Sequence, residues 1–342
     1  MKVFFKITIL VLAIVATCCI SKRNESSLTF QVSDFLVSKT VSVPVNSLLP
    51  FKVFITGDFL VIYDQQKTDL FKVFALPSIK FLFSWGEVGR GPGEFYLINS
   101  SSIIGFKDRF VFQDHQRVLT ATVDKNSILV TDDQMLKQQN EPINGLLRIN
   151  DSCFIFDRSS ADDFEHTFIN LKDDSKTFNF GEFNDPYNID EYYIREQVYT
   201  KTKAVKPDGR RIAVFYLFIN KFKLYDENLK IIKEVFIGGD NHFANFSISD
   251  LISKQMYNAE VVVNDSLIYV LNPNISLAEL RENKETLKPT ITVWNWDGEP
   301  IAKYQLDKPV CSFALSNNNR KIYAISTFVM NEIYEYELPG FR

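Results

Sequence analysis

The sequence has few of the residues that build metal sites or catalytic bases. Its 342 residues include only three histidines, His115, His166 and His242, and four cysteines. No two histidines show the H-x-x-x-H spacing with which one helix binds zinc. No G-x-S-x-G motif is present either, so the sequence does not predict a hydrolase serine.

The sequence also lacks a long basic run. Lys and Arg total 38 against 42 Asp and Glu, which gives a formal net charge of -4. A protein that binds nucleic acid needs a concentrated positive surface, so we expect no nucleic-acid partner. Apolar residues make up 46% of the chain, a proportion typical of a globular protein.

A long apolar run occurs only at the N-terminus. Residues Ile7 to Ala16 follow Lys2 and Lys6, and this run is too short to span a bilayer comfortably. Because no stop-transfer pattern flanks it, residues 1–17 are predicted to form a secretory signal peptide.

Two cysteines follow the signal sequence. The stretch "VATC" resembles a bacterial lipoprotein signal, in which small residues precede a cysteine that becomes lipidated, although a threonine in the last position is unusual. Cys18 is the expected lipidation site, Cys19 is the alternative, and an ordinary cleaved signal without a lipid is the third possibility. Residues 18–27 would then form a lipidated tether that anchors the protein at the outer membrane, facing the periplasm or the cell surface.

The other two cysteines, Cys153 and Cys311, are far apart and each lies beside apolar residues. A disulfide between them is permitted outside the cytoplasm, but spacing alone does not establish one. We expect two separate buried thiols.

After residue 20 the chain shows no long helical periodicity. Short alternating runs rich in Val, Ile, Phe, Tyr and Thr predict strands. A unit made of a small polar turn and an apolar strand recurs six times at intervals of about 40 to 60 residues, the spacing of propeller blades. The six strands end at Asp64, Asp114, Asp157, Tyr216, Asn272 and Ser326.

The remaining strands of each unit follow the same plan. A third strand follows in all six units and a fourth in five, but the sixth unit ends at Arg342 without one. The segment Thr40 to Val45 is expected to supply that missing outer strand, which would close the ring and remove free edges. Residues 28–342 are therefore predicted to form an all-β six-bladed propeller whose last blade is closed by an N-terminal strand. A pair of β-sandwiches is the alternative.

The long irregular segments all fall on connections that reach one face of such a ring. Two of them contain predicted helix starts, Ser247 with Asp250 and Ser276 with Glu279, at capping-box spacing. Because loops on a rigid scaffold often carry function, we expect the binding site on this face. The alternative is that the insertions only cap the ring.

A glycine-rich stretch, "GEVGRGPGEF", lies between the first two units. It has no Gly-Lys-Ser/Thr and opens no helix, so it is neither a phosphate-binding loop nor a dinucleotide fingerprint. A shorter copy, "FNFGEF", closes the third unit, which favours a structural role for the glycines. Arg90 could still bind an anionic ligand, or it could pair with Glu94.

The motif "GRGPGEF", in a six-unit β chain behind a lipoprotein signal, resembles the TolB-like six-bladed propeller lipoproteins of Gram-negative bacteria. The resemblance covers nearly all of the mature chain. It implies an extracytoplasmic propeller, and it transfers no catalytic residue to any position of this sequence.

The acids that end the second strands are candidate metal ligands. Asp64, Asp114 and Asp157 should all reach the decorated face, where a ring of carboxylates could hold Ca²⁺. The matching positions of the other three units are not acidic, and Asp also ends strands simply because it favours turns.

We expect a monomeric binding or scaffolding module for a peptide, glycan or partner protein, with no cofactor. The candidate residues on the ligand face are Arg90, Glu94, His115 and Arg158. The alternative function is a metal-assisted hydrolase or lactonase of the propeller type with a central Ca²⁺. Trp294 and Trp296 could stack on sugar rings, but packing within a blade is the simpler interpretation.

Overall fold

The computed structural model describes residues 28–44, 49–91, 93–136, 144–158, 163–183, 189, 192–238, 247–282 and 287–340. The predicted signal peptide (1–17) and tether (18–27), with Cys18 and Cys19, lie outside these ranges. Within them, no helix has the length and apolar character that a membrane crossing requires.

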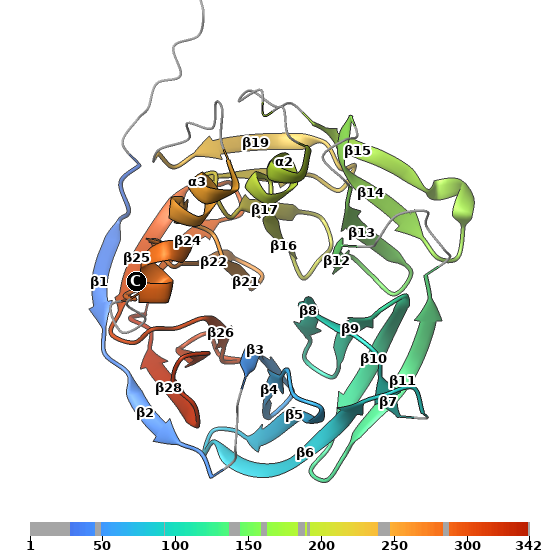
Figure 1. Cartoon of the computed structure of the whole chain (residues 1–342), viewed down its shortest axis with the longest axis vertical. Coiled ribbons are helices and arrows are strands. Elements are labelled where there is room, and N and C mark those ends of the chain that lie inside the picture. The colour runs from blue at the N-terminus through green and yellow to red at the C-terminus, as the bar shows by residue number, and fades with distance from the viewer. Residues whose placement is uncertain are drawn as a thin grey trace, which may run out of the picture.

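Six antiparallel sheets stand around a central axis and form a six-bladed β-propeller (Figure 1). We name the sheets blades A to F in chain order. Their innermost strands are β3 (Pro50–Thr56), β8 (Ile98–Gly105), β12 (Asn144–Arg148), β16 (Lys201–Val205), β21 (Glu260–Val263) and β26 (Ser312–Leu315). The second strands are β4 (Phe59–Asp64), β9 (Phe110–Asp114), β13 (Cys153–Asp157), β17 (Ile212–Tyr216), β22 (Leu267–Asn272) and β27 (Lys321–Ile325).

The third and fourth strands complete the blades. The third strands are β5 (Thr68–Ala75), β10 (Arg117–Val123), β14 (Phe164–Asn170), β18 (Lys221–Tyr225), β24 (Thr290–Asn295) and β28 (Glu332–Glu337). The fourth strands of blades A to E are β6 (Lys80–Val88), β11 (Ile128–Met135), β15 (Phe178–Glu182), β19 (Ile231–Phe236) and β25 (Pro300–Leu306). The six predicted turn-and-strand units are thus confirmed, and the β-sandwich alternative is wrong.

The core lies between neighbouring blades. The second strands β9 and β17 are buried at every position because both of their faces pack against other sheets. Phe71 of blade A, for example, lies 5.5 Å from the rings of Phe110 and Phe112 of blade B. Burial on both sides explains why these strands read as continuous apolar runs in the sequence.

The N-terminal segment closes the ring over two blades. Strand β2 (Lys39–Ser42) pairs antiparallel with β28 and is the predicted outer strand of blade F. A second strand that the sequence did not reveal, β1 (Val32–Leu36), runs parallel to β25 and adds a fifth strand to blade E. Between them, the backbone and hydroxyl of Ser38 both donate to the Asp307 carboxylate at 3.2 Å.

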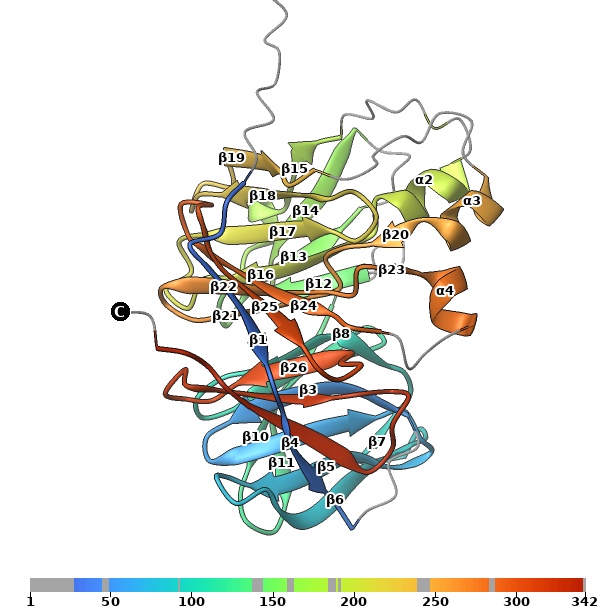
Figure 2. The ribbon, with the colours of Figure 1, turned by 90° about the vertical axis from the view of Figure 1, so that its left-hand side faces the viewer.

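Among the described residues, three short helices project from one side of the ring, which we call the helical face (Figure 2). Helix α2 (Tyr192–Val198) connects blades C and D, α3 (Ile248–Ser253) connects D and E, and α4 (Leu277–Glu282) lies within blade E. Both predicted helix starts are confirmed, because Ser247 with Asp250 and Ser276 with Glu279 form capping boxes. The described elements are completed by the two-residue strand β7 (Glu94–Phe95), the short pair β20 (Gln255–Met256) and β23 (Ile275–Ser276), and the 3-10 turn η1 (Asp174–Lys176).

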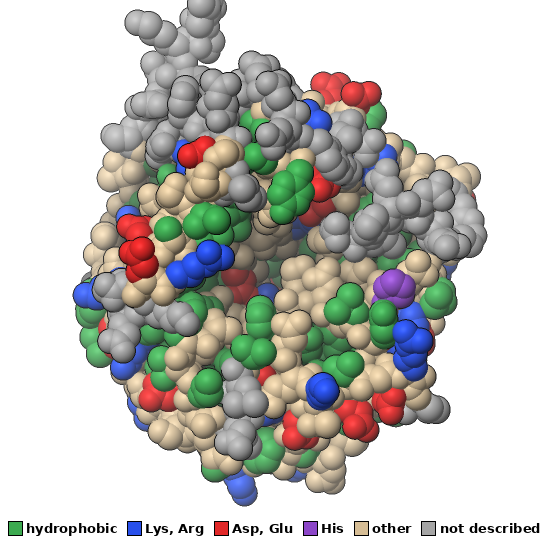
Figure 3. Space-filling model, in the orientation of Figure 1, with side chains coloured by type: hydrophobic (Ala, Val, Ile, Leu, Met, Phe, Trp, Pro, Cys, Tyr) green, Lys and Arg blue, Asp and Glu red, His purple; other side chains and the backbone are tan. Residues whose placement is uncertain are grey.

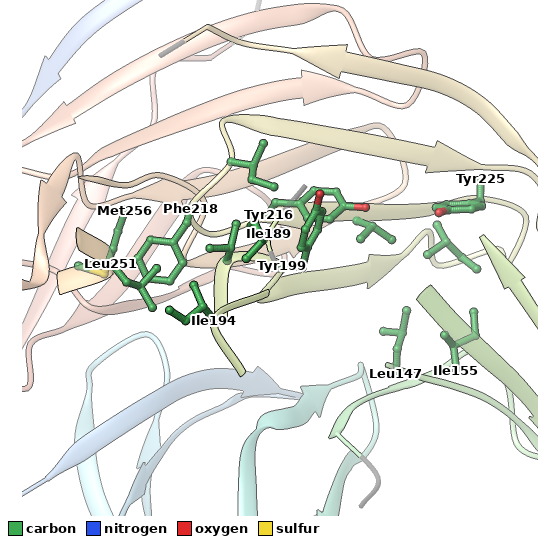
Figure 4. Close-up of a cluster of buried hydrophobic side chains, with 14 of the residues drawn as sticks. Leu147, Ile155, Ile189, Ile194, Tyr199, Tyr216, Phe218, Tyr225, Leu251 and Met256 are labelled. Carbon is green, nitrogen blue, oxygen red and sulfur yellow. The ribbon is translucent and has the colours of Figure 1, made fainter. Parts of the chain in front are cut away.

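The helices are fixed by apolar side chains that continue the core of blades C and D. Ile194 of α2 and Leu251 of α3 lie in one cluster with Phe218, Tyr216 and Met256 (Figure 4). Helices this short have little stability of their own, so this packing holds them on the ring.

Candidate functional site

The glycine-rich loop between blades A and B is organised by Glu94. The Glu94 carboxylate accepts a hydrogen bond from the backbone of Gly91 at 2.7 Å. Residues Glu94–Phe95 form strand β7, which runs parallel to the end of β6, and the Phe95 ring is buried 5.1 Å from Trp85. The loop is therefore an ordered turn, held by the Glu94 side chain, and it places the Phe95 ring between two blades.

The shorter copy of the motif shares this backbone geometry. Gly86 and Gly181 stand at matching places in the fourth strands of blades A and C, with φ of +85° and +70°. Residues with a Cβ rarely adopt such angles, which explains why glycine recurs there. The structural interpretation of the repeated glycines is supported.

Arg90, Tyr96 and His115 form a surface cluster beside this loop, which we call the Tyr96 cluster. The Arg90 guanidinium lies over the Tyr96 ring, 5.0 Å from its centroid, and the His115 ring meets it at 78° and 5.7 Å. Tyr96 is 50% exposed, and both basic side chains are also exposed. Among the described residues Arg90 forms no ion pair with Glu94, so the guanidinium is available to a ligand.

Arg158 lies apart from that cluster. It follows the second strand of blade C, and its guanidinium donates to Thr167 at 3.1 Å and to Asn179 at 3.3 Å. Arg158 therefore ties the outer strands of its own blade together. Of the four candidate ligand-face residues, the structure brings Arg90, Glu94 and His115 to one place and leaves Arg158 at another.

Asp64 of blade A and Asp114 of blade B make equivalent contacts. Each accepts a hydrogen bond from the backbone amide just before the innermost strand, Leu49 at 2.8 Å and Leu97 at 2.7 Å. Each also pairs with a base of the third strand: Lys72 lies 2.8 Å from Asp64, and Arg117 forms the equivalent pair with Asp114. These carboxylates hold the connections between blades in place on the helical face.

Asp157 has different partners. Its carboxylate accepts from Nδ1 of His166 at 3.0 Å and lies beside the Lys203 ammonium of the neighbouring blade. Gly145, on the innermost strand of blade C, leaves room for this contact, because a Cβ there would collide with Asp157.

Glu165, next to His166, is the centre of a buried ionic network between blades C and D. Lys201 lies 3.1 Å from its carboxylate, Lys223 contacts the other oxygen, and the Tyr216 hydroxyl donates to it. The side chain of Glu165 is 2% exposed. Because removing one partner of such a network would leave a buried charge uncompensated, the network locks the two blades together.

The network shifts the pKa values of its members. Burial and the positive charge of Lys201 lower the pKa of His166 to about 4, so this imidazole is neutral at neutral pH. Burial opposes ionisation of Asp157, but Lys203 and Lys201 prevail and lower its pKa to about 2. Burial also opposes ionisation of Glu165, but the positive charges of Lys201 and Lys223 hold its pKa far below its usual range.

The three predicted metal ligands do not converge. Asp64, Asp114 and Asp157 end the second strands of three different blades, and each is engaged by a base. Within the part of the chain that the structure describes, no group of three or more His, Cys, Asp or Glu residues is arranged to hold a metal ion.

A second ionic contact, which sequence reasoning missed, joins three innermost strands near the axis. Glu260 of blade E pairs with Lys52 of blade A. Its carboxylate also accepts from the Ser312 hydroxyl and the Phe313 backbone of blade F, both at 3.1 Å. No local pattern marks this contact, because its members come from strands more than 50 residues apart.

The helical face is divided into two halves. All three described helices rise from blades C, D and E, whereas blades F, A and B carry none in the described ranges. On this second half, large apolar side chains are 43% to 59% exposed, and Figure 3 shows apolar side chains across that part of the face around a central hollow. They are Leu49, Phe51, Val88, Tyr96, Leu97 and Met330.

Trp294 and Trp296 are buried, and the two described cysteines are partly buried. Trp294 is fully buried and Trp296 is 6% exposed, so neither can stack on a sugar ring. Cys153 and Cys311 are free thiols, and both are half-buried rather than fully buried.

Comparisons with known proteins agree with this architecture. A family model described as TolB-like 6-blade propeller-like matches residues 30–318. No curated protein matches the sequence.

Several solved structures share the fold at low sequence identity. A member of the DUF4221 family from Bacteroides vulgatus has 11% identity and a TM-score of 0.59, covering 88% of this chain and 97% of that one. A protein from Bacteroides fragilis has 14% identity and a TM-score of 0.54, covering 91% of this chain and 99% of that one. A luciferin-regenerating enzyme has 12% identity and a TM-score of 0.50, covering 89% and 96%. At such identities the likeness concerns the fold alone.

Proposed function

Since the chain belongs to the TolB-like six-bladed propeller family, we propose that it is an extracytoplasmic binding module that holds a protein or peptide partner. The partner would dock on the half of the helical face formed by blades F, A and B. We call this half the open face.

One observation carries the proposal: exposed apolar side chains gather on the open face around the Tyr96 cluster. Scattered apolar residues are normal on a surface, but several on one face, next to an exposed tyrosine and arginine, are typical of protein interfaces. Tyrosine and arginine are also the residues that most often dominate binding energy.

The rigidity of the open face supports this role. Leu49 and Leu97 are exposed, yet their backbone amides are held by the buried carboxylates of Asp64 and Asp114. A surface fixed before binding loses little conformational entropy when the partner arrives.

The enzymatic alternative has less support. A Ca²⁺ site needs several convergent oxygens that are free to bind the ion. Both oxygens of Asp64 already accept hydrogen bonds, from Leu49 and from Gln66 and Lys72, and Asp114 is engaged by Leu97 and Arg117.

We further propose that the protein is secreted and lipid-anchored through Cys18, with Cys19 as the alternative. The apolar run and the cysteine that follows it support this proposal. Metabolic labelling with a palmitate analogue tests it. Label that disappears in Cys18→Ala and persists in Cys19→Ala would support Cys18, the reverse would assign Cys19, and an unlabelled wild-type protein would contradict the anchor.

Site-specific photo-crosslinking tests the binding proposal. A photoreactive residue at position 97 on the open face should capture a defined partner in cells. The same residue at position 129 is the control, because Leu129 is similarly exposed (64% against 59%) but lies on the outermost strand of blade B at the end away from the helical face. Equal products from both positions would contradict a specific open face.

A further inference from the structure

A pocket opens on the side of the ring opposite the helices. It lies between blades C and D, where the β12–β13, β16–β17 and β18–β19 turns meet, and has a volume of about 430 Å³. This size suits a small molecule. Nothing in the proposed function uses it, because the open face lies on the other side.

One part of the pocket wall is apolar and aromatic. Ile149, Ile212 and Leu229 line it, and Phe168 and Phe178 lie stacked with their ring centroids 5.1 Å apart. Phe178 remains 47% exposed, so its ring is accessible to a second ring. Stacking on an accessible ring stabilises aromatic ligands beyond the effect of area alone.

The polar rim of the pocket is acidic. Asp226 and Glu227 line it, and no lysine or arginine is among its lining residues. The Asp226 carboxylate holds the turn by accepting from the backbone of Asn228 and Lys230, both at 2.9 Å. The Glu227 side chain is exposed and forms no ion pair with another described residue, so it is free to meet a cation.

We propose that this pocket binds a small aromatic amine. The ring would enter between the aliphatic side chains and stack on Phe178, and the ammonium group would face Glu227 at the rim. The charge of the rim decides between ligand classes, since an aromatic acid would meet two carboxylates and no compensating base.

Cys153 provides a reporter inside the pocket. Its thiol lines the cavity and is free and half-buried, whereas Cys311 lies in the core cluster near the helices. The full-length protein should be treated with N-ethylmaleimide with and without tryptamine, and each thiol followed by peptide mass spectrometry. Tryptamine should slow alkylation of Cys153 several-fold and leave the rate at Cys311 unchanged.

A matched probe series tests the charge requirement. Tryptamine, indole-3-ethanol and indole-3-propionate carry the same ring with a cationic, neutral or anionic tail. Calorimetry should show tryptamine binding about three- to fivefold tighter than the neutral probe, because one exposed ion pair stabilises a complex by about that factor. Indole-3-propionate should bind weakest.

Three variants test where the probes bind. Glu227→Gln should remove the preference for tryptamine over indole-3-ethanol, and Glu282→Gln, the same change on helix α4, should keep it. Phe178→Ala should weaken all three probes, with thermal unfolding as the check that the partly exposed position is tolerated. The proposal is overturned if no probe protects Cys153, if the three probes bind equally, or if Glu227→Gln keeps the preference.

Discussion

Glu94 fills the space beside Gly89 that a side chain at that position would need. Its carboxylate turns back to the amide of Gly91, and the chain after it places Phe95 between two blades and Tyr96 on the surface. The glycines of "GRGPGEF" therefore make room for a carboxylate, and that carboxylate sets the shape of the candidate binding surface.

This relationship predicts that Gly89 and Glu94 are energetically coupled. Gly89→Ala should cost about 1–3 kcal/mol of unfolding free energy, because the new Cβ collides with the Glu94 carboxylate. Gly89→Ala combined with Glu94→Ala should cost less than the sum of the two changes in a double-mutant cycle of urea unfolding. Gly340→Ala, where no atom lies within 4 Å of the new Cβ, is the control. Strict additivity would contradict the coupling.

Asp64 is predicted to be structural. Asp64→Ala would leave the Lys72 ammonium, whose side chain is 3% exposed, without its partner in the core. Breaking such a buried pair should cost about 3–5 kcal/mol, measured by chemical denaturation. Asp133→Ala removes a carboxylate that is 46% exposed and pairs with Arg117, and should cost less than about 1 kcal/mol. Similar costs for both variants would argue against the assigned role.

His166 should make stability depend on pH. Its pKa is lowered from 6.5 to about 4 by burial and by Lys201, so the unfolded chain binds an extra proton between these values. The stabilisation is complete above pH 6.5 and is lost as pH falls towards 4, by an amount on the order of 3 kcal/mol.

Unfolding free energies at pH 7, 6, 5 and 4 measure this effect. His166→Gln should flatten the decline between pH 6.5 and 4, whatever its effect at pH 7. His115→Gln changes an exposed ring on the surface and should leave the decline as it is. Parallel curves for wild type and His166→Gln would contradict the assignment.

The N-terminal segment is predicted to contribute to closure of the ring. The half-buried ring of Phe30 meets Trp294 edge to face at 5.2 Å, whereas Phe35 is 55% exposed. Phe30→Ala should lower the unfolding free energy by about 1–3 kcal/mol and Phe35→Ala by less than about 0.5 kcal/mol, measured by thermal and urea unfolding. Equal effects would show that Phe30 does not contribute to closure.

The sequence predicts the blades well because their signals are local. A polar turn followed by a doubly buried strand recurs in every unit, and each occurrence is visible within a few residues. Strand β1 was missed because it pairs in parallel with β25, about 270 residues away, and no turn marks such a pairing.

Part of the candidate site could be predicted from the sequence. The acids that end the second strands were placed correctly on the helical face, but the bases opposite them were overlooked. Asp114 stands directly across the hairpin from Arg117, and Asp157 across from His166, a pairing that strand register could have revealed. The Glu165 network could not be predicted from the sequence, because its lysines come from another blade.

The central claim is that the open face binds a partner, and one comparison of affinities tests it most directly. Leu97→Asp places a charge on the open face, and Leu129→Asp makes the same change at similar exposure on the outermost strand of blade B, at the end away from the helical face. With the partner captured at position 97, calorimetry should show Leu97→Asp weakening the affinity at least about tenfold, while Leu129→Asp stays within about twofold of wild type. Equal affinities for both variants, at unchanged unfolding temperature, would contradict the account.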